Sequence, residues 1–252
     1  MSKRRLNTSG RSITTIRGTV PPRRESRVFS VAVLLVLLLP LFLASCAPKH
    51  MDTSIEGVRL EQLLDELRRV SSIEAVLSIE YEKKDGALSG DAFLHLAHDT
   101  LTMRIYYLGF LAGEVTEEEG VIRSKPKLDR SKSILLVDGL RNSFFWWNMK
   151  EYRIEEKEDV YLLYNSYRKV VISKKTLLPV RQTIELESGD TIEIAYDEPA
   201  WNAGAAGGSA APLQQRYQSK LTIGLRNHLV RVKVKSYTAQ EKSALHTLTR
   251  TP

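Results

Sequence analysis

Few side chains in this 252-residue sequence are of types and spacings that could perform catalysis or bind a metal. There is one cysteine, Cys46, and His95 and His98 are the closest pair among five histidines. On a strand an odd separation places two side chains on opposite faces, which does not suit one metal ion. The sequence has no phosphate-binding glycine loop, no HExxH and no GxSxG motif. We therefore expect no enzymatic activity, no metal site and no cofactor.

The single cysteine is placed for covalent attachment of lipid. Residues 1–27 are basic, residues 28–48 carry no charge, and the apolar run Val31–Leu43 leads into Leu43-Ala44-Ser45-Cys46. A basic region followed by an apolar one is typical of a secretory signal. The tetrad resembles a bacterial lipobox, in which the cysteine is diacylated and becomes the new N-terminus.

We accordingly expect residues 1–45 to be a signal peptide and residues 46–54 a lipidated tether, so that the protein is membrane-anchored. A signal anchor that stays in the membrane is the first alternative, although Pro40 and Ser30 weaken a spanning helix. A twin-arginine signal at Arg23-Arg24 is a second alternative, and the true start codon is left open.

The charge of the body argues against a nucleic-acid partner. Residues 1–45 hold eight of the 37 Lys and Arg and a single acid, Glu25, which leaves 29 basic and 29 acidic residues from Cys46 onward. A phosphate-binding body carries a basic excess. With no further cysteine the body has no disulfide, and we expect a monomer held by an ordinary core.

The hydrophobic pattern predicts one helix followed by many strands. An amphipathic helix is expected over residues 57–71, because leucines recur there at helical spacing. A second helix is expected over residues 130–148. Strands are expected at 75–84, 87–97, 100–107, 111–117, 121–124, 151–157, 159–166, 168–174, 180–187, 190–197, 217–225 and 228–238.

These elements predict one α+β domain over residues 55–240. Its architecture is a strongly curved antiparallel sheet, a half-open barrel, with an N-terminal helix and a helical lid. Residues 199–215 are rich in Gly, Ala, Pro and Ser and are expected to form a flexible insertion. Residues 241–252 are expected to form a disordered tail.

Four successive aromatic residues, Phe144, Phe145, Trp146 and Trp147, lie near the end of the second predicted helix. Helical neighbours point about 100° apart, so all four cannot face one core from a helix. If two stay uncovered, they expose an apolar patch near the limit for a soluble surface. The run is therefore an ordinary core helix, a lid over an apolar cavity, or a membrane contact.

A second apolar segment, Tyr106-Tyr107-Leu108-Gly109-Phe110-Leu111, spans a predicted turn, where polar residues are normally found. Its side chains either tuck under a neighbouring element or protrude into an apolar environment.

Together these features resemble the bacterial lipoprotein-localisation proteins, the LolA and LolB family. The resemblance covers about residues 57–238 as a pattern: an amphipathic helix, a meander, the segment Met103–Gly109 running into a Leu-Gly tip, and an inserted lid. It departs from the family pattern at Tyr107, where the family has proline, and in the 199–215 insertion.

The resemblance implies a half-barrel whose cavity accepts the acyl chains of lipoproteins or other lipid, with Leu108 as the membrane-facing tip. It also implies a periplasmic lipoprotein carrier as partner and, with Ala47 after the cysteine, a location at the periplasmic face of the outer membrane. The expected function is to receive lipoproteins and insert them at that membrane. The alternative is a non-transporting envelope lipoprotein that acts as an assembly or scaffold partner. An open apolar concavity favours lipid binding, and a filled one favours the scaffold.

Overall fold

The computed structural model describes residues 57–83, 86–202 and 213–241, all of which belong to one compact unit of the chain, residues 52–252. The predicted signal peptide, the lipobox Leu43, Ala44 and Ser45, and Cys46 lie outside the described residues. Within those ranges, no helix is both long and apolar enough to cross a membrane.

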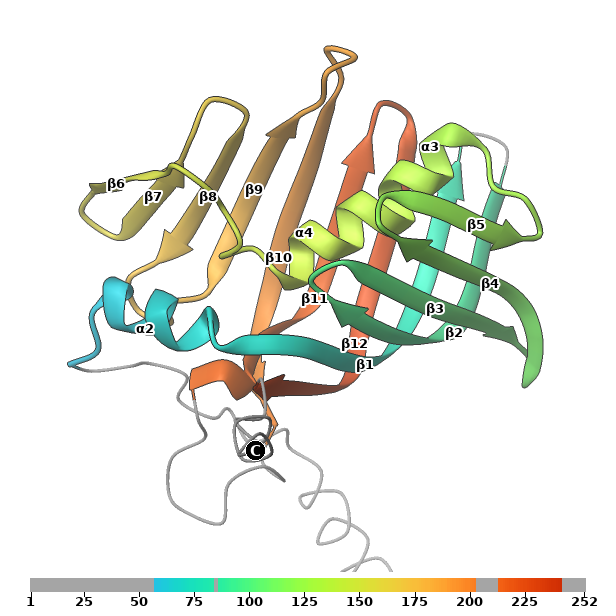
Figure 1. The fold of residues 1–252 in the computed structure, drawn as a ribbon, viewed down its shortest axis with the longest axis horizontal. Helices are drawn as coiled ribbons and strands as arrows, with labels where there is room; N and C mark the ends of the chain where they lie inside the picture. Colours follow the sequence, from blue (N-terminus) through green and yellow to red (C-terminus); the bar gives the residue numbers. More distant parts are fainter. Residues whose placement is uncertain (1–56, 84–85, 203–212, 242–252) are drawn as a thin grey trace, which may run out of the picture. The chain divides into compact units, whose positions relative to one another are not determined.

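A single antiparallel sheet of twelve strands forms the body (Figure 1). The strands are β1 (Val70–Lys83), β2 (Gly86–Ala97), β3 (Thr100–Tyr107), β4 (Phe110–Glu118), β5 (Val121–Lys125), β6 (Arg153–Glu156), β7 (Val160–Tyr164), β8 (Arg168–Ser173), β9 (Pro179–Glu185), β10 (Thr191–Trp201), β11 (Arg216–Leu225) and β12 (His228–Glu241).

Two meanders make up this sheet, and the pairing of β1 with β12 joins them. The spatial order is β5-β4-β3-β2-β1-β12-β11-β10-β9-β8-β7-β6. β5 and β6 lie at the two ends, so the sheet is not closed. The predicted meander and antiparallel sheet are confirmed.

Alternation along each strand explains why one face of the sheet is buried. In β12, Val230, Val232 and Val234 are buried, whereas Arg231 and Lys233 between them are exposed. In β12 this period of two places the valines on the buried face of the sheet.

Helix α2 (Leu60–Leu67) precedes the sheet and buries four leucines, Leu60, Leu63, Leu64 and Leu67. It is shorter than the predicted range 57–71. The helix cannot reach residue 71, because β1 begins at Val70. The Val70 side chain is fully buried in the core as part of that strand.

A continuous helical run lies against one face of the sheet between its two halves (Figure 1). It consists of α3 (Arg130–Ser133), the π-helical stretch η2 (Ile134–Gly139) and α4 (Leu140–Phe144). We call residues 130–148 the lid segment. Gly139 permits close packing on β11, because a Cβ at this position would lie 2.8 Å from Cγ2 of Ile223.

The prediction of a helix to residue 148 is wrong at its C-terminal end. The helix ends at Phe144, because Phe145 leaves helical geometry with φ −99° and ψ 49°. Phe145, Trp146 and Trp147 therefore lie on the turn that follows the helix.

The predicted 199–215 insertion is ordered at both ends. At its first end, β10 extends to Trp201, which pairs with Arg216 of β11. At its second end, residues Leu213–Gln215 form the short 3₁₀ helix η4. The Gln215 side chain donates to the Ala239 carbonyl at 2.8 Å and accepts from the Ala239 N–H at 3.3 Å. Residues 203–212 and the tail 242–252 lie outside the described residues.

Candidate functional site

All four aromatic residues of the lid segment are buried. Phe144, Phe145, Trp146 and Trp147 expose only 2–5% of their surface. The protein's own side chains cover all four, so they form no exposed apolar patch. The helix ends at Phe144, and the following turn redirects the next three side chains towards the same core.

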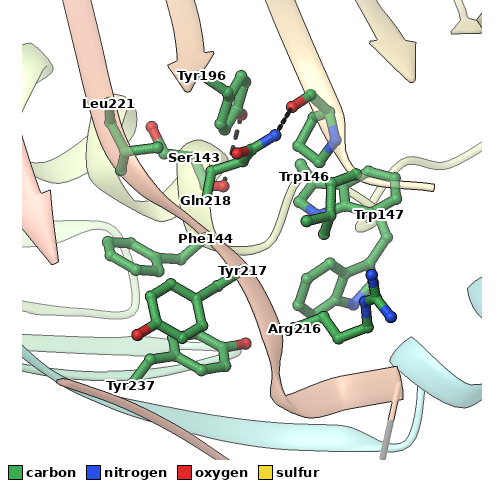
Figure 2. A pocket seen from close by; sticks show the side chains of 12 residues that line it. Ser143, Phe144, Trp146, Trp147, Tyr196, Arg216, Tyr217, Gln218, Leu221 and Tyr237 are labelled. Carbon is green, nitrogen blue, oxygen red and sulfur yellow. Dashed lines mark hydrogen bonds between the residues drawn. The ribbon is translucent and has the colours of Figure 1, made fainter. Parts of the chain in front are cut away.

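Phe144, Trp146 and Trp147 pack with Tyr217 and Tyr237 of the sheet around one small cavity (Figure 2). Phe144 stacks on Tyr237 of β12 at 6.3 Å between ring centroids, and Tyr237 stacks on Tyr217 of β11 at 4.8 Å. Trp147 makes edge contacts with Phe145 and Trp146 at 5.5 and 5.6 Å. Side chains of the protein itself therefore occupy the space where an open hollow was expected.

Two small cavities remain in this packing. The first has a volume of about 20 Å³ and lies among the aromatic residues, Gln218 and Tyr196, as Figure 2 shows. The second, about 10 Å³, adjoins Trp146 and Leu63 of α2. Each can hold about one water molecule, and neither can hold an acyl chain.

The C-terminal end of the lid helix is held by a buried arginine. Arg168 of β8 donates to the backbone carbonyls of Asn142, Trp146 and Asn148 at 3.1–3.2 Å, and to that of Phe145 at 3.4 Å. No carboxylate within the described ranges forms an ion pair with it. The guanidinium thus satisfies carbonyls that the helix end leaves unpaired, at the negative end of the helix dipole.

Burial lowers the pKa of Arg168 to about 10, so the side chain stays charged at neutral pH. Gln182 and Tyr196 extend the network. With the Gln182 amide oriented to satisfy both of its polar atoms, Oε1 accepts from Arg168 at 3.2 Å and Nε2 donates to the Tyr196 hydroxyl at 2.9 Å. The Tyr196 hydroxyl in turn reaches the Ser143 carbonyl at 3.5 Å. Burial raises the pKa of Tyr196, which keeps its proton for this contact.

The first half of the sheet holds the lid segment through a second set of polar contacts. Arg141 of α4 forms an ion pair with the buried Glu117 of β4, and it donates to the carbonyls of Ala97 and His98 at 2.8 and 2.7 Å. Asp138 lies one helical turn before Arg141, in η2. Burial is the main cause that raises the pKa of its carboxyl, and the charge of the nearby Glu117 is the second. The lid segment is therefore fastened to both halves of the sheet.

Two polar atoms that line the cavity of about 20 Å³, the larger of the two beneath the lid segment, have no hydrogen-bond partner within the described residues. They are Nε1 of Trp147 and Oε1 of Gln218, both buried. The amide nitrogen of Gln218 donates to the Pro179 carbonyl at 2.8 Å (Figure 2). Trp147 and Gln218 thus bring one unpaired donor and one unpaired acceptor to the cavity wall, which the side chain of Arg216 also lines.

The hairpin between β3 and β4 protrudes. Tyr107 pairs with Phe110, and the two residues between them adopt positive φ, 49° at Leu108 and 83° at Gly109. The exposed fractions are 57% for Tyr107, 81% for Leu108, 79% for Phe110 and 58% for Leu111. We call Tyr107–Leu111 the tip, and its side chains protrude rather than tuck under a neighbour.

The rest of the described surface contains shallow hollows but no cluster of metal-ligating side chains. In the part of the chain that the structure describes, no group of three or more His, Cys, Asp or Glu side chains could hold a metal. Two shallow surface hollows of about 450 and 580 Å³ surround the β7–β8 turn near Tyr164 and Tyr167, and side chains of both charge signs line them.

The aromatic run and the tip were predicted from the sequence, but the residues that hold the lid segment were not. A signal for three of them was present. Arg168 is in phase with the buried Val170 and Ile172, as Gln182 is with Ile184 and Tyr196 with Ile194. A polar residue in phase with the buried face of a strand predicts a buried hydrogen-bonding group.

Comparison with known proteins gives fold-level similarity only. No family model matches the chain, and no curated protein matches it. A LolA superfamily protein from Nitrosomonas europaea matches over 74% of this chain and 96% of its own, with 10% identity and a TM-score of 0.47.

The fold is similar to that of LolA superfamily structures. A putative outer membrane lipoprotein-sorting protein domain from Vibrio parahaemolyticus matches over 72% of this chain and 92% of its own, with 9% identity and a TM-score of 0.44. A DUF1329 family protein from Desulfovibrio piger covers 72% and 90%, with 10% identity and a TM-score of 0.43. All three structures are thus similar to this chain over most of its length, at 9–10% identity.

Proposed function

We propose that this chain is a lipoprotein, anchored through Cys46, that binds acyl chains of lipoproteins or other lipids beneath its lid segment. In this proposal it receives lipoproteins from a periplasmic carrier and inserts them at the outer membrane, as a monomer and without turnover chemistry. Binding of the acyl chain would draw its free energy from burial of apolar surface, about 25 cal/mol per Å².

The observation that carries the proposal is the exposed tip. Leu108 occupies a left-handed conformation that Asn or Gly adopts at less cost, and it exposes a large apolar side chain there. A hairpin that only needed to turn in water would carry a polar residue at this position, as the β4–β5 turn does with Glu119. Contact of the leucine side chain with an apolar partner, such as the bilayer interior, offsets the conformational cost of leucine at positive φ.

Acyl binding in this proposal requires movement of the lid segment. The cavities of about 20 and 10 Å³ are too small for a chain, so the ligand must replace lid aromatics on the sheet. Such a replacement exchanges one apolar contact for another, and the net cost is small compared with opening an empty hollow. In this proposal the π-helical stretch η2 acts as the hinge, since such stretches are frequent at functional sites in helices.

The experiment for this proposal is depletion followed by complementation. Cells without the protein should accumulate outer-membrane lipoproteins away from the outer membrane, as measured by membrane fractionation. Wild-type protein and Val121→Glu should restore sorting, whereas Leu108→Glu should not. Val121 is the matched control, because it is an exposed apolar residue at the start of β5, next to the end of β4 that is remote from the tip. Normal sorting in depleted cells, or full rescue by Leu108→Glu, would contradict the proposal.

The filled concavity favours a second candidate, a scaffold or assembly partner that takes up no lipid. Purification without detergent, followed by solvent extraction and lipid analysis, separates the two. Acyl lipid bound non-covalently at a constant ratio supports the lipid-binding function, and its absence from protein purified with its partners supports the scaffold.

A further inference from the structure

We infer that Trp147 and Gln218 recognise the head of the acyl ligand, and that this head is a secondary amide. The inference rests on the proposed lipid-binding function and names the chemistry of its ligand. Both side chains line the larger cavity beneath the lid segment (Figure 2).

The cavity contains unsatisfied hydrogen-bonding capacity that a purely structural core has no reason to keep. Nε1 of Trp147 is a donor without an acceptor, and Oε1 of Gln218 is an acceptor without a donor. Trp147 is 4% and Gln218 6% exposed, so bulk water does not satisfy either atom. Buried polar groups of this kind are rare, and each one left unpaired is destabilising.

The orientation of the Gln218 amide is fixed by the protein. Its Nε2 donates to the Pro179 carbonyl at 2.8 Å, so reversing the amide would break that hydrogen bond. Oε1 consequently stays the acceptor. A ligand head that satisfies the site must accept from Trp147 and donate to Gln218.

A secondary amide provides both functions on adjacent atoms, because its carbonyl accepts and its N–H donates. An ester offers acceptors only and leaves Oε1 of Gln218 unpaired. A carboxylate likewise has no donor for Oε1 of Gln218, although the Arg216 guanidinium on the same cavity wall is a partner for its charge. The cavity of about 20 Å³ holds about one water molecule, which can also donate and accept there, so an amide head enters only when the Trp146 ring moves.

Apolar surface for the chain that follows such a head adjoins the site. The second cavity lies next to Trp146, which lines both cavities. Leucine side chains dominate its wall, namely Leu63, Leu67, Leu177, Leu178 and Leu213. Displacement of the Trp146 ring would open a path from the polar site towards α2.

The test compares N-methyldodecanamide with methyl dodecanoate, which differ only at the atom in question, and includes dodecanoate as a third, anionic ligand. Their dissociation constants are measured by competition with a fluorescent acyl probe. The protein is the full chain carrying Cys46→Ser, which removes the expected covalent lipid. We expect the amide to bind about tenfold or more tightly than the ester, since the ester leaves a buried acceptor unpaired.

Variants separate the roles of the two side chains. Gln218→Met should bring the amide-to-ester ratio close to one, because it removes the acceptor that only the amide N–H can use. Trp147→Phe removes a donor that both carbonyls can use, so it should weaken both ligands and keep the ratio. Trp146→Phe is the control, because it removes an indole N–H from the same cavity wall but none of the unpaired atoms, and it should keep the preference. Circular dichroism of each variant establishes whether it is folded. The amide-to-ester ratio of the parent chain tests the inference even if a variant fails to fold.

The outcomes separate the inference from the function on which it rests. Equal binding of amide and ester by the parent chain would overturn the inference and leave acyl binding standing, with the cavity holding only water. Tighter binding of dodecanoate than of the amide would also overturn it in favour of an anionic head. Failure of all three ligands to bind would overturn both the inference and the proposed lipid-binding function.

Discussion

At the scale of single residues, Arg168 holds the lid by a mechanism that needs no opposite charge. Its guanidinium contacts four carbonyls near the end of α4, and no acid within the described ranges shares it. Carbonyls left by the end of a helix carry partial negative charge and accept charge-assisted hydrogen bonds. The lid segment is thus bound to the sheet by directional contacts as well as by burial.

Replacing Arg168 by methionine should loosen the lid segment. The change leaves several buried acceptors unpaired, and we expect the free energy of unfolding to fall by about 2–4 kcal/mol. Urea denaturation of the full chain measures it. Lys169→Met, at the exposed neighbouring position, should change stability by less than about 0.5 kcal/mol. Equal stability of the two variants would show that the arginine does not hold the lid.

Asp138 predicts a pH dependence of stability. Burial raises the pKa of this carboxyl above its ordinary value, so the folded state binds its proton more tightly than the unfolded chain does. The ionised group therefore destabilises the fold above its folded-state pKa, and this penalty disappears below the unfolded value near 3.9.

Asp138→Asn should consequently raise the melting temperature at pH 7 and have little effect at pH 3.5. Thermal unfolding at both pH values checks the sign. Asn should lose no hydrogen bond of the carboxylate, because none is found for it in the described part of the chain. A variant that is less stable than wild type at pH 7 would contradict the assignment.

At the scale of elements, two hairpins of the same geometry differ in one residue that bears on function. The β3–β4 turn is Leu108-Gly109 and the β4–β5 turn is Glu119-Gly120, and all four residues have positive φ. Both turns are of the type that prefers Asn-Gly. The backbone requirement is therefore the same, and only the tip places an apolar side chain there.

Leu108→Asn should stabilise the protein while weakening its contact with membranes. We expect a gain of roughly 0.5–1 kcal/mol in unfolding free energy, because asparagine tolerates the left-handed conformation better. Binding to phosphatidylethanolamine–phosphatidylglycerol vesicles, measured by co-sedimentation of the Cys46→Ser chain, should fall. Glu119→Asn should give a similar gain in stability with unchanged vesicle binding. A Leu108→Asn chain that binds vesicles as wild type does would remove the tip from membrane contact.

Much of the element pattern was predictable from the sequence, and the exceptions have local causes. Alternation and turn residues located every strand, and β3 was predicted with its bounds, residues 100–107. The lid helix was overextended, because aromatic spacing does not reveal that Phe145 leaves helical geometry. Its π-helical stretch was likewise not predictable from spacing, since it depends on packing against β11 through Gly139.

At the scale of the whole described unit, the sequence predicted the antiparallel sheet but not the state of its concave face. Whether that face is open depends on the turn after Phe144 and on Arg168, Gln182 and Tyr196, which come from three different strands. Pairing of β1 with β12 brings the two meanders together and sets the width that the lid aromatics fill. Such a three-dimensional fit has no signature in a one-dimensional pattern.

The central claim is that acyl chains enter beneath the lid segment and contact its tryptophans. Bromine atoms quench tryptophan fluorescence on contact, so 9,10-dibromostearate can be added to the full chain carrying Cys46→Ser and Trp201→Phe, which retains only Trp146 and Trp147. The account predicts saturable quenching that unbrominated stearate competes away. Unquenched fluorescence at ligand concentrations where the chain remains folded would contradict it and leave the filled sheet as a scaffold.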